Sequence, residues 1–316
     1  MTGRRALLRG ALGAVLVAAG AAGCDSRESG AGPGGTGTAS PTALPATTAW
    51  RPDATDVAPE VKLRAVRLVE ALGAWSAGGG GPDRARERLA ALGLPAGLAA
   101  QAGALRPPAD RAALQVVYAQ YGGITDDAAS VLVVCRQWTR TGTGPVVPGG
   151  TTVDVRLTRS RPDPTVTALH PAAPVRPAAD LSATARQVLA DRRVVLPPAA
   201  EADVRGGGVH DSVLRTMLRL GRTYRLDVSV LRSGHPRNVF DTDRPSDHPP
   251  GRAFDVWAID GRAVAAPRTP RALVEAFMRA AADAGSYNVG GPVALPGGLF
   301  FSDATHHDHV HVGFDR

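Results

Sequence analysis

Histidine placement constrains the fold of this chain more than any other feature of its sequence. Six of the eight histidines fall within the last 82 of its 316 residues, and four of those six lie between His306 and His311. Only three side chains need to converge to hold a catalytic metal ion and leave a fourth position open for water. We therefore expect a fold that brings residues 306–311 close to ligands from another C-terminal segment.

A second segment, residues 246–255, supplies candidate partners. Its sequence, SDHPPGRAFD, places His248 and Asp255 seven positions apart. The Pro-Pro-Gly run predicts a turn, and beyond it Ala253, Asp255 and Trp257 alternate onto one face of a strand. Asp255 would therefore come from a rigid element, while His248 folds over it from the turn.

The pair His309 and His311 completes the candidate set. Residues two apart on a strand share a face, so both imidazoles would point the same way while Val310 and Val312 enter the core. Two neighbouring imidazoles on a buried face need partners. One as a metal ligand, and the other as a group that orients a ligand or transfers protons, would satisfy both.

These segments match the pattern SxHxxGxAxD followed by HxH. The fixed positions of the first pattern are Ser246, His248, Gly251, Ala253 and Asp255. Over about residues 181–316 the chain thus resembles the zinc peptidase superfamily of lysostaphin, D-alanyl-D-alanine carboxypeptidases and murein endopeptidases. The resemblance implies one zinc ion per chain, bound by His248, Asp255 and His311. It also implies that His309 assists catalysis, either by taking a proton from water or by stabilising the tetrahedral oxyanion.

Several further side chains are candidates with two interpretations each. Arg232 resembles the arginine with which the family grips a substrate carboxylate or carbonyl, and an Arg fork suits a carboxylate. The alternative is a surface residue at a strand end. His306 and His307 could line a cleft or lie in a solvated loop. Asp247 and Asp303 could orient an imidazole or lie on the surface.

The N-terminal part of the sequence indicates export. Residues 1–23 combine three arginines with a short apolar stretch and predict an export signal. Cys24 follows in a lipobox-like context and would become a lipidated N-terminus; plain secretion is the alternative. Residues 24–59 are rich in Gly, Ser, Thr and Pro, which predicts a flexible tether. Cys135 lies in an apolar run, so we expect a buried thiol and no disulfide.

Periodicity predicts two small α+β domains, residues 60–175 and 178–316, joined by a linker over 171–177. In the second domain an antiparallel sheet would carry the zinc site. The length of this second domain, about 140 residues, predicts that it folds alone. Helices are predicted near 61–72, 84–92, 182–190, 211–222 and 271–284, and strands near 114–121, 130–138, 151–157, 165–169, 225–231, 252–259 and 310–314.

The function expected from this combination is zinc-dependent hydrolysis of peptidoglycan stem peptides at D-Ala-containing bonds, outside the cytoplasmic membrane and lipid-anchored to it. A wall-peptide-binding lipoprotein without activity and a metal-handling lipoprotein are the alternatives. The net charge of +7 falls to 33 basic against 29 acidic residues once the leader arginines are removed. This evenly spread charge does not predict nucleic-acid binding.

Overall fold

The computed structural model describes residues 43–160 and 162–315, and these belong to one compact unit. The predicted export signal, Cys24 and residues 25–42 of the predicted tether lie outside the described residues. Helices and largely antiparallel sheets are combined throughout, so the predicted α+β class is confirmed. No helix in the described part of the chain is both long and apolar enough to span a membrane.

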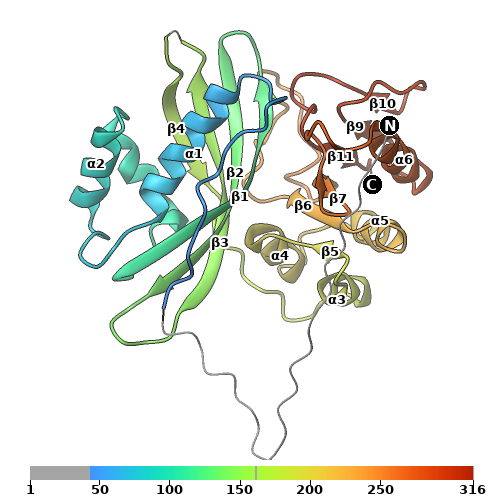
Figure 1. Ribbon diagram of the computed structural model, residues 1–316. Coiled ribbons are helices and arrows are strands. Elements are labelled where there is room, and N and C mark those ends of the chain that lie inside the picture. Colours follow the sequence, from blue (N-terminus) through green and yellow to red (C-terminus); the bar gives the residue numbers. More distant parts are fainter. Residues whose placement is uncertain (1–42, 161, 316) are drawn as a thin grey trace, which may run out of the picture. The chain divides into compact units, whose positions relative to one another are not determined.

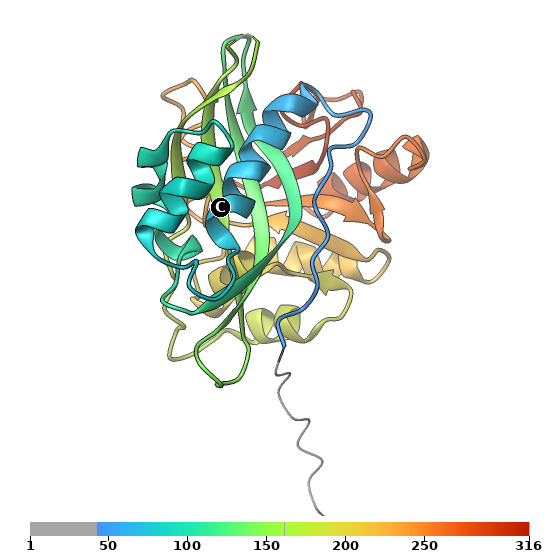
Figure 2. The ribbon, with the colours of Figure 1, turned by 60° about the vertical axis from the view of Figure 1, so that its left-hand side comes forward.

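The N-terminal half packs helices against one face of a four-stranded antiparallel meander (Figures 1 and 2). Its elements are α1 (Pro59–Gly73), α2 (Pro82–Ala91), the short 3-10 helices η1 (Ala96–Gln101) and η2 (Gly103–Leu105), β1 (Arg111–Ile124), β2 (Ala128–Arg140), β3 (Val147–Thr158) and β4 (Thr165–Pro171). The β2 strand is buried almost continuously from Ala129 to Cys135 rather than at alternate positions. Such burial means that both faces of this sheet are covered.

The C-terminal half covers the second face and has its own sheet. Its elements are α3 (Ala183–Ala190), β5 (Val194–Val195), α4 (Pro198–Arg205), α5 (Asp211–Gly221), β6 (Leu226–Val230), β7 (Ala253–Ile259), β8 (Arg262–Ala263), α6 (Arg271–Asp283), β9 (Asn288–Gly290), β10 (Phe300–Phe301) and β11 (Val310–Gly313). The strand order is β10-β9-β11-β7-β6-β5, with β8 beside β7. The central pairings are antiparallel as expected, but both outer pairings, β5–β6 and β10–β9, are parallel.

Most long elements follow the sequence pattern. Ser182 caps α3, because its side chain accepts a hydrogen bond from the backbone N–H of Ala185 at 3.0 Å. The α4 helix and the short strands β5, β8, β9 and β10 were not anticipated. Strands of two or three residues offer too little alternation to be recognised by periodicity.

The two halves share buried surface, so two independent domains are not established. Leu132 and Val134 of β2 form a common apolar cluster with Val230 of β6. Residues 172–182, which include most of the predicted linker, contain no helix or strand. Cys135 is buried as expected, without a disulfide partner among the described residues, and burial raises its pKa to about 12.

Residues 43–58 differ from the prediction of a flexible tether. Trp50 and Val57 pack against the core of the N-terminal half. Thr48 exchanges two hydrogen bonds with the side chain of Gln115 on β1. The few large apolar side chains in this segment therefore decide its placement, although its average composition is that of a linker.

Candidate metal site

Three predicted ligands converge in the C-terminal half. His248 Nε2 lies 3.1 Å from His311 Nδ1 and 3.2 Å from Asp255 Oδ1, and His311 Nδ1 lies 3.0 Å from Asp255 Oδ1. All three residues are buried: the exposed fraction is 1% for His248, 1% for Asp255 and 8% for His311. The structure thus brings together one oxygen and two nitrogen donors from segments 56 and 63 residues apart in sequence.

Strand register and a tight turn explain this convergence. The β11 and β7 strands pair antiparallel with His311 directly opposite Asp255. The turn after His248 passes through Gly251 at φ 78°, where a Cβ atom would lie 2.0 Å from the carbonyl oxygen of Gly208. Only glycine fits this position. His248 is then fixed from behind, because its Nδ1–H donates to the carbonyl of Leu231 at 2.6 Å.

The charge and protonation of these groups favour a cation between them. With its Nδ1–H directed to the carbonyl of Leu231, His248 turns Nε2 towards His311 and Asp255. Burial lowers the pKa of His311 to about 4, so this imidazole is neutral at pH 7. Burial alone would raise the pKa of Asp255, but the neighbouring His248 and His309 hold it well below its usual value. Three electron-pair donors therefore face one another.

A small tetrahedral metal ion fits the observed spacing. Zinc–nitrogen and zinc–oxygen bonds of about 2.0–2.1 Å in tetrahedral geometry place ligand atoms roughly 3.3 Å apart. The three distances of 3.0–3.2 Å come close to that value without a change of fold. Two imidazoles and one carboxylate are also a donor set that zinc enzymes use.

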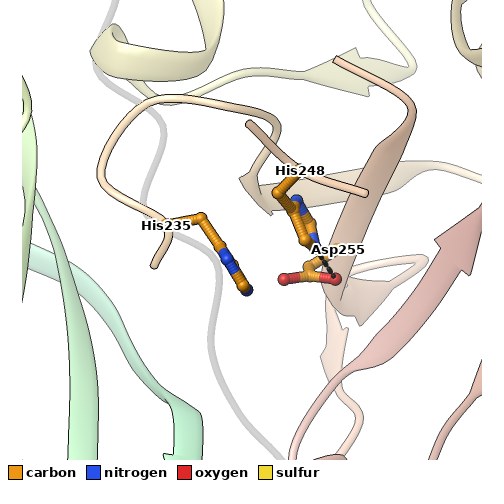
Figure 3. Close-up of side chains that lie close together, drawn as sticks. All are labelled: His235, His248 and Asp255. Atoms are coloured by element: carbon orange, nitrogen blue, oxygen red, sulfur yellow. Dashed lines mark ion pairs between the residues drawn. The ribbon is translucent and has the colours of Figure 1, made fainter. Parts of the chain in front are cut away.

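His235 is a further neighbour of this site. Its ring lies beside that of His248 (Figure 3), and the two rings stack with centroids 4.1 Å apart and planes at 15°. Donor atoms of His235, His248 and Asp255 all lie within 4.8 Å of one another, which is also a possible metal-binding group. His311 makes the tighter set, because its Nδ1 lies within 3.1 Å of both other donors. Nothing in the local spacing of His235 could have indicated this contact.

His309 lies beside the three donors and is oriented by a chain of buried charges. Its Nδ1–H donates to Asp308 Oδ1 at 2.6 Å, and its Nε2 lies 3.8 Å from Asp255 Oδ2. Burial opposes protonation of His309, but the charge of Asp255 and the hydrogen bond to Asp308 outweigh it and raise its pKa. His309 is therefore placed to exchange a proton next to the candidate metal position.

A second group with metal-like spacing consists of Asp56, His307 and Asp308. Lys62, the only lysine in the chain, forms ion pairs with both carboxylates of this group. Its ammonium thus supplies the positive charge that a metal ion would bring. We conclude that this group is a buried salt-bridge network rather than a second metal site.

The three candidate ligands line a cavity of about 550 Å³, and residues of both halves form its walls. Residues 121–125 of β1 and its following turn form one side, and the loop around Phe240 forms another. His306 also lines it, held by a 2.7 Å hydrogen bond from Nδ1 to Asp303, so both residues belong to the cleft. Asp247 lines it too, but it accepts hydrogen bonds from Tyr287 and Arg252 rather than from an imidazole.

Arg232 lies elsewhere. Its side chain is exposed, its Nε–H donates to the carbonyl of Pro249 at 2.7 Å, and it is not among the residues that line the cavity. Arg244 and Arg252 are the arginines that do line it among the described residues. A role for Arg232 in gripping substrate stays a prediction.

Comparison of the chain with models of protein families, with curated proteins and with solved structures found no match. The assignment of function therefore depends on the motif and on the geometry of the site.

Proposed function

We propose that this protein is a zinc-dependent peptidase that hydrolyses D-Ala-containing amide bonds in peptidoglycan stem peptides. The observation that carries the proposal is the convergence of His248 Nε2, His311 Nδ1 and Asp255 Oδ1 within 3.2 Å at the base of an open cavity. The resemblance of these residues to the lysostaphin and D-alanyl-D-alanine carboxypeptidase superfamily supports the same chemistry. The residues present fit zinc in donor type, spacing and burial.

A zinc ion held by these three groups would polarise the scissile carbonyl and acidify a water molecule. The protein's own residues would do the rest. His309, oriented by Asp308, would accept a proton from water and return it to the leaving amine. The raised pKa of His309 suits the second of these steps, because the group must carry a proton when the amide nitrogen leaves.

The cavity supports a peptide as substrate. It lies between β1 and the C-terminal loops, and its lining includes exposed Arg244 as well as Arg252. A guanidinium that lines the same cavity as the candidate ligands could bind a peptide carboxylate or carbonyl. Arg244 is better placed for this contact than Arg232. The export signal and lipidated Cys24 expected from the sequence would put the enzyme where peptidoglycan lies.

One experiment tests the proposal directly. Purified protein is analysed for metal by mass spectrometry and then incubated with whole muropeptides, with and without a chelator. We expect one zinc per chain and products shortened at a D-Ala bond, with activity lost on chelation and restored by zinc. Bound zinc with muropeptide binding but no cleavage would indicate a binding protein. Several exchangeable metal ions per chain would indicate metal handling.

A further inference from the structure

The N-terminal half contributes no candidate ligand, yet it contacts the metal site through Gln120. Side chains alternate along β1, so Tyr118 and Gln120 face the C-terminal half while Ala119 and Tyr121 face the helices. Gln120 is fully buried, and its Nε2–H donates to Asp255 Oδ2 at 2.6 Å. This bond holds the carboxylate so that Oδ1, and not Oδ2, faces His248 and His311.

A second contact comes from α1. Lys62 is fully buried and forms ion pairs with Asp56 and with Asp308 Oδ2. The other oxygen of Asp308 accepts the hydrogen bond from His309 Nδ1, and the hydroxyl of Tyr118 donates to the Asp308 backbone carbonyl at 2.9 Å. Lys62 and Tyr118 thereby fix the position of Asp308, and Asp308 fixes the ring of His309 with Nε2 towards Asp255.

We propose that Gln120 and Lys62 are positioning residues of the active site, so that the N-terminal half completes a metal centre whose ligands all belong to the C-terminal half. Gln120 sets which carboxylate oxygen of Asp255 is offered to the metal. Lys62 acts through Asp308 on the orientation and tautomer of His309. This inference rests on the proposed zinc peptidase function.

The two residues have different expected effects, which separates positioning from mere support of the fold. Removal of a residue that hydrogen-bonds to a metal ligand typically lowers the metal affinity by about 10–100-fold. Gln120 touches a ligand, so its loss should weaken metal binding. Lys62 contacts no ligand and reaches the site only through Asp308, which orients His309. Its loss should therefore lower kcat and leave metal affinity within about threefold of wild type.

The Gln120 arm compares Gln120→Leu with Gln137→Leu in the full chain. Gln137 is a matched control because it is a buried glutamine on the adjacent strand β2, where its Nε2 donates to the carbonyls of Gly73 and Leu105. We expect Gln120→Leu to bind Zn²⁺ and Co²⁺ about 10–100-fold more weakly in chelator competition and to alter the Co²⁺ absorption spectrum. Gln137→Leu should lower the melting temperature and keep both the affinity and the spectrum.

The Lys62 arm compares Lys62→Gln with the charge-retaining Lys62→Arg. We expect kcat on muropeptides to fall at least about tenfold in Lys62→Gln, with KM unchanged, and Lys62→Arg to recover part of the loss. Nitrogen NMR of the histidine rings should show that His309 loses its fixed tautomer in Lys62→Gln. If that variant does not fold, Lys62→Met with Asp56→Asn removes the ammonium together with one of its two carboxylates and carries the same test.

The inference is overturned if Gln120→Leu binds Co²⁺ with wild-type affinity and spectrum, or if the Lys62 variant keeps wild-type kcat and the His309 tautomer. Equal losses in Gln120→Leu and Gln137→Leu would also overturn it, because they would show a purely structural role. A wild-type protein that binds neither metal fails at an earlier step. That result would refute the proposed function itself and the positioning roles with it.

Discussion

The two halves of the molecule differ in how far their functional residues can be predicted from sequence. The C-terminal half holds His248, Asp255 and His311 within a pattern that can be recognised residue by residue. The N-terminal half has no such pattern, yet Lys62 and Gln120 reach the same site from α1 and β1. The candidate ligands follow a recognisable spacing because they all come from the turn after His248 and from the paired strands β7 and β11. Supporting residues can come from any element packed against them, so they leave no local signature.

Removal of a ligand should have the largest effect and sharpen this contrast within the C-terminal half. We expect His311→Ala to abolish retention of zinc and peptidase activity together, because it removes one of three donors. His309→Ala should retain zinc and lose about 10²–10⁴-fold in activity, because it removes only the proton-transfer group. Metal content and muropeptide turnover distinguish the two variants. Equal loss of metal in both would reverse the roles assigned to this pair.

Separation of the halves should have the next largest effect. The length of residues 178–316 predicts that they fold alone, but in the intact chain Asp308 and Asp255 are bonded to Lys62 and Gln120. We expect the isolated segment to bind Zn²⁺ at least about tenfold more weakly than the full chain, since it lacks a partner of a metal ligand. Calorimetric titration measures the difference. A fragment that binds Zn²⁺ as tightly as the full chain would show that the N-terminal half does not support the metal site.

Acid should destabilise the metal-free protein through its buried imidazoles. Burial lowers the pKa of His311 to about 4 and that of His235 well below its usual value, whereas both are free to protonate near pH 6.5 when unfolded. Between pH 6.5 and about 4 the unfolded chain binds more protons, so stability falls as pH falls. For His311 the change in stability over this range is on the order of 3 kcal/mol.

The measurement for this prediction is the free energy of unfolding of the metal-free protein in urea at several pH values. Wild type should lose more stability than His311→Asn between pH 6.5 and 4. The raised pKa of His309 acts in the opposite direction and at higher pH, where its contribution is lost as pH rises through its folded value. Parallel pH profiles for wild type and variant would show that His311 is not buried as a neutral imidazole.

Substrate contact should give the smallest effect and refine the comparison within the C-terminal half. Arg244 lines the cavity, and Arg232 is exposed and bonded to Pro249. We expect Arg244→Ala to raise KM for muropeptides severalfold, about 1 kcal/mol of lost binding, and Arg232→Ala to leave it nearly unchanged. Steady-state kinetics of the two variants decides between them. A larger effect at Arg232 would restore the role suggested by its resemblance to the family arginine.

The α+β class, most of the longer helices and strands, and the segments that hold the candidate ligands could be predicted from local sequence patterns. These are local properties, because helical and strand periods and the turn at Gly251 depend on neighbouring residues. The same locality explains what was missed. The short outer strands, the packed segment 43–58 and the position of His235 depend on contacts with distant parts of the chain.

Tertiary structure alone decided how the site is supported. A buried lysine is costly unless oppositely charged groups surround it, and the carboxylates that surround Lys62 lie six and 246 residues away in the chain. Gln120 and Asp255 are 135 residues apart. No pattern of spacing connects the pairs Lys62–Asp308 and Gln120–Asp255, because only the packing of the two halves against each other brings them into contact. The sequence therefore identified the donors, and the fold determined what holds them in place.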